Sequence, residues 1–145
     1  MERRTAVRRY VAIVHGEPAG ERFTIDAPIA RDPDDRERMA IINNGKSAIS
    51  HVLKLQRLEQ NRTLLAVRLE TGRTHQIRVH LASIHHAVIG DPLYAMPHLS
   101  EEPLQLHAAM LTFCDPVSGE EVTVFAPPPE DFESEDIHES SVAEV

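Results

Sequence analysis

The segment Gly72-Arg-Thr-His-Gln-Ile-Arg-Val-His-Leu81 combines a turn signal, several polar side chains and a helical apolar pattern. Thr74 follows a Gly-Arg pair and is a typical helix N-cap, so we predict a helix over residues 74–85 that begins there. Apolar residues recur at the spacing of one helix face: Ile77, Leu81 and Ile84. This face is predicted to pack on a core.

The polar residues at the start of this helix suggest an anion site. Backbone N–H groups at a helix N-terminus favour negative charge, and Arg73 and Thr74 add donors there. Arg78 lies one turn further along, where its guanidinium could reach a carboxylate. An amphipathic helix with a hydrated polar face would give the same pattern, so the residues alone leave both interpretations open.

Segments on both sides of the predicted helix are rich in residues that favour β-strands. We predict strands at 8–14, 46–58, 63–70, 104–113 and 121–126. Residues 25–38 are rich in Pro and Asp and are predicted to form a connecting loop, and Asp115-Pro-Val-Ser-Gly119 is typical of a hairpin turn. Several strands with short links and one clear helix predict an α+β fold, with a mainly antiparallel mixed sheet and few helices.

The composition is that of one globular domain. The chain has 145 residues, of which 41% are hydrophobic and 26% charged. No apolar run approaches the length of a membrane helix, and no signal peptide is recognisable, so we expect a cytoplasmic protein without a membrane partner. The single cysteine, Cys114, excludes an internal disulfide and a multi-cysteine zinc site.

The net charge of −8 is unevenly distributed. Residues 130–145 hold seven acidic side chains and no Lys or Arg, whereas residues 1–129 hold 16 acidic and 15 basic side chains. We therefore predict a folded region over 1–129 and a disordered acidic tail over 130–145. A tail that repels misplaced RNA is the alternative. Thirteen of the 15 basic residues are arginine, the side chain best suited to phosphate.

Two loop segments resemble ligand-binding motifs but lack residues that those motifs require. Asn44-Gly-Lys-Ser47 ends like a phosphate-binding loop, but Ala40 stands where that motif needs a glycine. Asp32-Pro-Asp-Asp35 starts like a calcium loop, but Glu37 and Asn43 stand where that loop needs Gly and Glu. Neither segment predicts a ligand of its own.

The nine histidines do not predict a metal site either. His75, His80 and His85 are five residues apart, whereas a helix presents metal ligands on one face at a spacing of three or four. No carboxylate completes a set of ligands. Structural or RNA-facing roles are the expectation for these histidines.

Several motifs together resemble the RluA-like family of RNA pseudouridine synthases. They are Arg9-Tyr-Val-Ala-Ile-Val-His-Gly16, Glu70-Thr-Gly-Arg-Thr-His-Gln-Ile-Arg-Val-His-Leu-Ala82, Val88-Ile-Gly-Asp-Pro-Leu-Tyr94, Leu106-His-Ala-Ala-Met-Leu111 and Phe125-Ala-Pro-Pro-Pro-Glu-Asp-Phe132. The resemblance extends over about residues 3–132. It implies a pseudouridine synthase catalytic domain that isomerises uridine to pseudouridine in RNA, with ribosomal RNA as the expected substrate, after the base is flipped from the strand. It implies no cofactor and no metal.

The resemblance also implies roles for individual residues. Tyr10 matches the family tyrosine that packs on uracil, and Arg78 matches the arginine that pairs with the catalytic aspartate. A second group is expected to bind the substrate: Arg73, Thr74, His75, Gln76 and His80.

The family aspartate itself has no counterpart in this chain. In the family it lies in a His-Arg-Leu-Asp segment upstream of the tyrosine, and this chain contains no such segment. Asp26 and Asp91 fall in other motifs, at turns, and are not expected to replace it. We therefore interpret the chain as the C-terminal portion of an N-terminally truncated catalytic domain that is inactive alone, with a separate chain as one source of the missing half. The alternatives are a non-catalytic RNA-binding module and a degenerate remnant.

Overall fold

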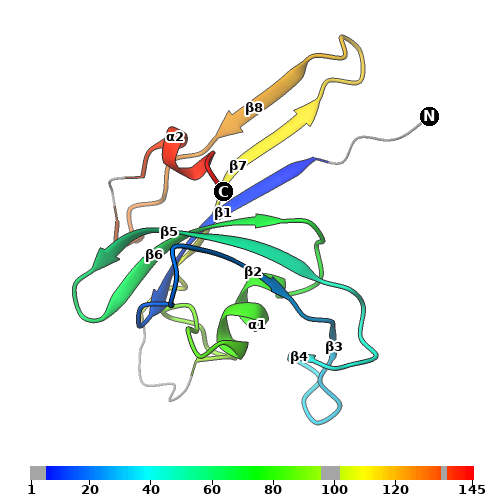
Figure 1. Cartoon of the computed structure of the whole chain (residues 1–145), viewed down its shortest axis with the longest axis vertical. Helices are drawn as coiled ribbons and strands as arrows, with labels where there is room; N and C mark the ends of the chain where they lie inside the picture. Colours follow the sequence, from blue (N-terminus) through cyan, green and yellow to red (C-terminus); the bar gives the residue numbers. More distant parts are fainter. Residues whose placement is uncertain (1–5, 96–101, 135–136) are drawn as a thin grey trace.

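The computed structural model describes residues 6–95, 102–134 and 137–145, and within them the main element is an antiparallel six-stranded sheet (Figure 1). In spatial order its strands are β2 (Arg22–Asp26), β5 (Ile49–Leu58), β6 (Arg62–Leu69), β1 (Val7–His15), β7 (Leu106–Cys114) and β8 (Glu121–Phe125). The α+β fold with a mainly antiparallel sheet is thus confirmed.

The centre of the sheet is the strand β1. It pairs with β6 on one side, from Arg8 opposite Leu69 to His15 opposite Arg62. On its other side it pairs with β7, where the register shifts between Arg9 and Tyr10. The four residues Val11–Val14 are fully buried, because both faces of the sheet are covered here.

One face of the sheet is covered by α1 (Gln76–Ser83) (Figure 1). Ile77 and Leu81 pack into a core that includes Val14 and Val67, as the helical spacing predicted. The predicted N-cap is wrong, since the helix is preceded by His75 with a φ of 54° and no side-chain cap. The side chain of Gln76 reaches back from the first turn and accepts the hydrogen bond of the Arg73 N–H at 3.0 Å, so it holds the turn that leads into the helix.

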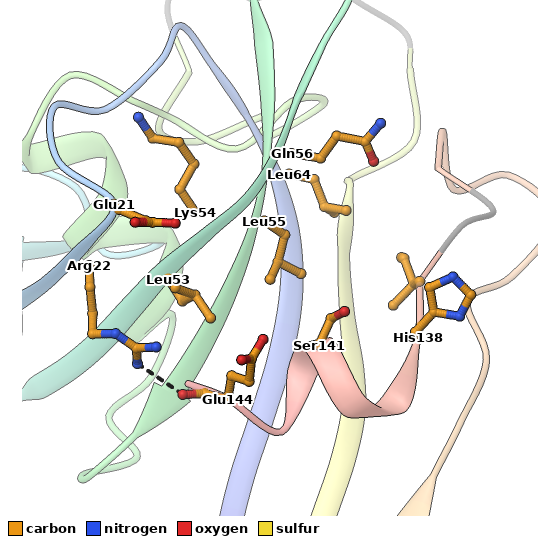
Figure 2. A pocket seen from close by; sticks show the side chains of 11 residues that line it. Glu21, Arg22, Leu53, Lys54, Leu55, Gln56, Leu64, His138, Ser141 and Glu144 are labelled. Carbon is orange, nitrogen blue, oxygen red and sulfur yellow. Dashed lines mark hydrogen bonds between the residues drawn. The ribbon is translucent and has the colours of Figure 1, made fainter.

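The opposite face is covered by the C-terminal segment, which differs from the predicted disordered tail. Its last helix, α2 (Glu139–Val142), is short and packs its Val142 fully buried. Apolar residues interspersed with the acidic ones join the core below the sheet: Phe132, Ile137 and Val142. Figure 2 shows the segment beside β5, with Arg22 donating to the carbonyl of Glu144 at 2.9 Å. The prediction rested on the number of charges and did not consider these apolar residues, which cover the second face of the sheet.

Residues 25–38 contain regular structure where a connecting loop was predicted. β2 ends at Asp26, and β3 (Ile29–Arg31) pairs with β4 (Met39–Ile41) as a small hairpin. Pro and Asp residues form the turn between them, where Asp32 accepts a hydrogen bond from the Asp34 N–H at 2.8 Å. The hairpin packs beside α1 through a third core cluster: Ile29, Ala48, Val79 and Tyr94. No helix in the described part of the chain is long and apolar enough to cross a membrane.

Candidate functional site

The centre of the candidate site is an ion pair between Arg78 and Asp91. Arg78 projects from α1, and its Nε and Nη2 donate to the two carboxylate oxygens of Asp91, each at 2.9 Å. The Asp91 side chain is fully buried and that of Arg78 is 14% exposed. A two-point, charge-assisted contact of this kind fixes the plane and position of the guanidinium.

Both members of the pair stay charged. Burial acts to raise the pKa of Asp91, but hydrogen bonds from Arg78 and from the backbone N–H groups of Leu93 and Tyr94 outweigh it, so the pKa is lowered. The hydrogen bond to Asp91 raises the pKa of Arg78 against the opposing effect of burial. The carboxylate thus holds Arg78 and also the turn that follows Gly90.

Tyr94 connects this pair to the β3–β4 hairpin and to the start of α1. Its hydroxyl accepts a hydrogen bond from the Met39 N–H at 2.9 Å and lies 2.9 Å from Nδ1 of His75. The guanidinium carbons of Arg38 and Arg78 lie 5.1 and 5.2 Å from the centre of its ring. Cations at that distance are attracted by the ring electrons. Tyr94 therefore holds three separate segments at one place.

His75 lies at this junction as the last residue before α1. Burial lowers its pKa, and the positive charge of Arg78 lowers it further. The imidazole is therefore neutral over a wider pH range than a free histidine. Its exposed neighbour Thr74 and the half-buried Arg73 complete the turn, where Arg73 donates from Nε to the carbonyl of Ser47 at 2.8 Å.

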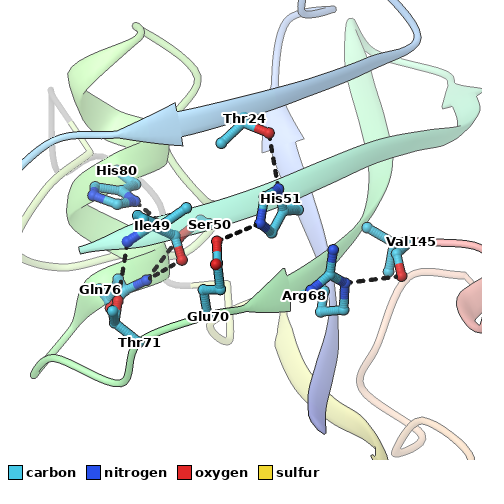
Figure 3. Close-up of polar contacts among 10 residues, drawn as sticks. All are labelled: Thr24, Ile49, Ser50, His51, Arg68, Glu70, Thr71, Gln76, His80 and Val145. Atoms are coloured by element: carbon cyan, nitrogen blue, oxygen red, sulfur yellow. Dashed lines mark hydrogen bonds and ion pairs between the residues drawn. The ribbon is translucent and has the colours of Figure 1, made fainter. Parts of the chain in front are cut away.

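Gln76 lies inside the protein, with only 3% of its surface exposed. Its Oε1 accepts from the Thr71 hydroxyl at 2.7 Å, and its Nε2 donates at 3.0 Å to the carbonyl of Ile49 and to the Ser50 hydroxyl (Figure 3). The amide thereby ties the first turn of α1 to β5. Its polar atoms are used within the scaffold and do not face a surface that a substrate can reach.

His80 is fully buried, one turn further along α1. Its Nε2 lies 2.9 Å from the carbonyl of Ala27 and must donate to it. Nδ1 then accepts from the Ser50 hydroxyl at 2.8 Å (Figure 3). Burial lowers the pKa of His80, so this neutral arrangement is the stable one.

Tyr10 lies on the α1 side of the sheet. It is half-buried between Val67 and Ala108 on the neighbouring strands and packs against the core that contains Ile77 and Leu81. Among the described residues its hydroxyl has no hydrogen-bond partner, and no hydrogen bond or ring contact joins it to Arg78. The structure therefore places both predicted catalytic residues on the same side of the sheet.

Two residues of the cluster, Asp91 and Tyr94, had no predicted role. Both lie in the segment 88–94, which the sequence marked as a motif, and the turn signal of Gly90-Asp-Pro92 suggested only a loop. Asp91 contacts Arg78, 13 residues away in the sequence, and Tyr94 contacts Met39, 55 residues away. A local sequence pattern cannot predict such contacts. In the described segments no group of three or more His, Cys, Asp or Glu could hold a metal ion.

Comparisons with known proteins all find RNA pseudouridine synthases. A sequence profile described as RNA pseudouridylate synthase matches residues 1–83. An uncharacterized RNA pseudouridine synthase of Bacillus subtilis, YlyB, is 46% identical over 129 residues, which are 88% of this chain and 42% of that protein. The ribosomal large subunit pseudouridine synthase D of Zymomonas mobilis is 42% identical over 137 residues, which are 87% of this chain and 43% of that protein. The chain thus spans about two fifths of the length of these relatives.

Two solved structures have similar folds. Human RNA Pseudouridylate Synthase Domain Containing 1 superposes with a TM-score of 0.75 at 28% identity, over 86% of this chain and 55% of the other. Human RNA Pseudouridylate Synthase Domain Containing 4 superposes with a TM-score of 0.69 at 23% identity, over 88% and 59%. In both cases the chain accounts for little more than half of the larger molecule.

Proposed function

The chain belongs to the RNA pseudouridylate synthase family, and from this membership we propose that it contributes to the isomerisation of uridine to pseudouridine in ribosomal RNA in the cytoplasm. The Zymomonas mobilis relative is named for the large ribosomal subunit, which supports that choice of RNA. The reaction breaks the bond between the sugar and N1 of uracil and forms a bond from the sugar to C5. C5 loses a proton and N1 gains one, so the product is an isomer with no net oxidation or reduction.

The observation that carries this proposal is the fixed guanidinium of Arg78 on the same side of the sheet as Tyr10. In our proposal the Tyr10 ring packs on the flipped uracil, since aromatic rings stack on bases. Arg78 orients the reacting carboxylate from its anchored position. Arg73, Thr74 and His75 lie at the exposed turn before α1 and contact the RNA.

We revise the proposed role of Gln76 and His80 from substrate contact to positioning. Both are buried, and their polar atoms hold α1 against β5 and against Ala27. Removing either would tilt the helix that carries Arg78. Their effect on RNA would therefore be indirect.

The catalytic aspartate in this proposal comes from outside the 145 residues. The relatives are more than twice as long as the matched region, so they contain room for it. It could lie on a longer polypeptide or on a separate chain that supplies the N-terminal half. Asp91 does not serve instead, because both of its oxygens are bound by Arg78 and its side chain is fully buried.

One observation favours a second candidate, a non-catalytic RNA-binding module. Arg78 already has a full carboxylate partner in Asp91, so it is satisfied without an incoming aspartate. In such a module the turn at Arg73 and Thr74 would bind RNA while no isomerisation takes place.

A single experiment separates these possibilities. The purified chain is incubated with a ribosomal RNA fragment carrying tritium at uridine C5, and tritium release is measured with and without a polypeptide that contains the N-terminal half of a relative. We expect RNA binding by the chain alone and tritium release only in the mixture, with loss of release in Tyr10→Ala, which removes the stacking ring, and in Arg78→Lys. Release by the chain alone would refute the need for an external aspartate. Binding without release in either condition would identify the module, and absence of binding would refute both.

A further inference from the structure

A basic cleft of about 500 Å³ lies beside the candidate site. It is bounded by β3, by residues 44–46 and by the turn 72–74. Three cationic side chains line it, and no acidic side chain does: Arg31, Lys46 and Arg73. In a chain with a net charge of −8, a carboxylate-free cleft of this kind requires an explanation.

The three cations are not neutralised within the protein. Other basic residues have carboxylate partners, such as Arg62 with Glu102 and Arg78 with Asp91. Within the described ranges, none of the three forms a salt bridge. Arg31 donates to the carbonyl of Arg36 and Arg73 to that of Ser47, so each keeps N–H groups for a ligand. Clustered charge of one sign in a cleft raises the local concentration of counter-ions.

The backbone holds Lys46 at the cleft wall. Ile29 and Lys46 exchange two backbone hydrogen bonds of 2.9 Å, one in each direction. The exchange requires a glycine at position 45, because a Cβ there would lie 2.7 Å from the carbonyl carbon and oxygen of Ile29. Gly45-Lys46, which failed as a phosphate-loop motif, therefore has a definite structural role beside the cleft.

A fourth cation links the cleft to Tyr10. The Arg8 guanidinium lies directly against Gly72, so closely that a Cβ at that position would overlap it. Arg8 and Tyr10 are two residues apart on β1 and therefore project from the same face of the sheet. On the other side, Met39 lines the cleft and donates its N–H to Tyr94 of the candidate site.

From this arrangement we infer that the cleft binds phosphodiester groups of the RNA strand next to the nucleotide that is presented to Tyr10 and Arg78. This inference rests on the proposed function and adds the residues that hold the strand, namely Arg31 and Lys46 with Arg73. Each cation replaces a counter-ion condensed on a phosphate, so the contact is independent of base sequence.

The test is the salt dependence of RNA binding to the intact chain. Affinity for a fluorescent single-stranded ribosomal RNA oligonucleotide is measured by anisotropy over a range of KCl concentrations. Each phosphate contact adds roughly 0.7 to the slope of log K against log salt for a single strand. We expect Arg31→Gln and Lys46→Gln each to reduce the slope by about that amount and to weaken binding at low salt.

Two further variants make the result specific. Arg57→Gln removes one positive charge from a side chain on β5 that is 71% exposed and lies outside the cleft, and it should leave the slope unchanged. Lys46→Arg keeps the charge and should restore the wild-type slope. All substituted side chains are exposed, and circular dichroism verifies that each variant is folded.

The outcomes are distinct. RNA binding whose slope is equal in the wild type and in the Arg31 and Lys46 variants would overturn the inference and leave the proposed function standing. Absence of RNA binding by the folded wild type would overturn both. A dinucleotide that binds as tightly as the longer oligonucleotide would show that the cleft holds one free phosphate and not a strand, which would also overturn it.

Discussion

Replacing Asp91 with Asn tests whether the buried ion pair determines the position of Arg78. The substitution keeps the shape of the side chain and keeps Oδ1, which accepts hydrogen bonds from the backbone of Leu93 and Tyr94. It removes the negative charge that faces the guanidinium. Arg78 would then be a largely buried cation whose partner no longer compensates it.

The expected cost follows from the exposure of the two side chains. Breaking a buried ion pair by removing one partner costs about 3–5 kcal/mol. Asp91 is fully buried but Arg78 is 14% exposed, so water screens part of the loss and we expect about 2–3 kcal/mol. For a chain of this size, where about 1 kcal/mol lowers Tm by roughly 2–4 °C, Tm should fall by roughly 5–10 °C.

The assay is thermal and urea unfolding of the 145-residue chain. The control is Asp32→Asn, because Asp32 faces Arg38 at 4.0 Å with 22% of its side chain exposed and should cost less than about 1 kcal/mol. The double variant Arg78→Gln/Asp91→Asn should be less destabilised than the sum of the single variants, by about 1–3 kcal/mol. A cost for Asp91→Asn equal to that of the control would refute our assignment of the pair as the interaction that fixes Arg78.

The pH dependence gives an independent measure of the same pair. Because the folded pKa of Asp91 is lowered, its stabilising contribution is present above the ordinary carboxyl pKa, near 3.8. That contribution is lost as the pH falls through the lowered value. The difference in stability between wild type and Asp91→Asn should therefore be constant near neutrality and should shrink only in strongly acidic solution.

Two other predictions concern the scaffold. Val142→Ala removes two methyl groups from a fully buried position in α2 and should cost about 2 kcal/mol in urea unfolding; a cost near zero would mean that the C-terminal segment does not pack on the sheet in solution. Burial lowers the pKa of His80, so its imidazole should titrate below 6.5 by NMR, and the chain should lose stability as the pH falls below 6.5, where the unfolded state takes up the proton first. A midpoint at or above 6.5 would contradict the buried, neutral arrangement.

Local patterns predicted most of the secondary structure correctly. The helix face of Ile77 and Leu81 and the hairpin turn at 115–119 depend on spacing and on turn residues within a few positions. Such signals need no knowledge of the rest of the chain. The hairpin of β3 and β4 was missed because its strands are only three residues long and are separated by a Pro- and Asp-rich turn.

The acidic C-terminus shows where composition misleads. Its charges suggested a hydrated tail, yet Phe132 and Val142 are buried against the sheet. The free energy gained by covering an apolar sheet face decides this, and that face exists only once Val11 and Ile13 are aligned in β1. Whether a segment packs on the surface of a sheet cannot be predicted from the composition of that segment alone.

The sequence by itself determined the family, the positions of most strands along the chain and the helix that carries Arg78, because long motifs and short-range periodicity encode them. Only the tertiary structure decided that Asp91 forms an ion pair with Arg78 and that Gln76 and His80 are buried. It also decided that Arg31 and Lys46 line one cleft. These contacts join residues far apart in the chain. Their geometry follows from strand register and helix packing, in which a shift of one residue would turn each side chain to another face.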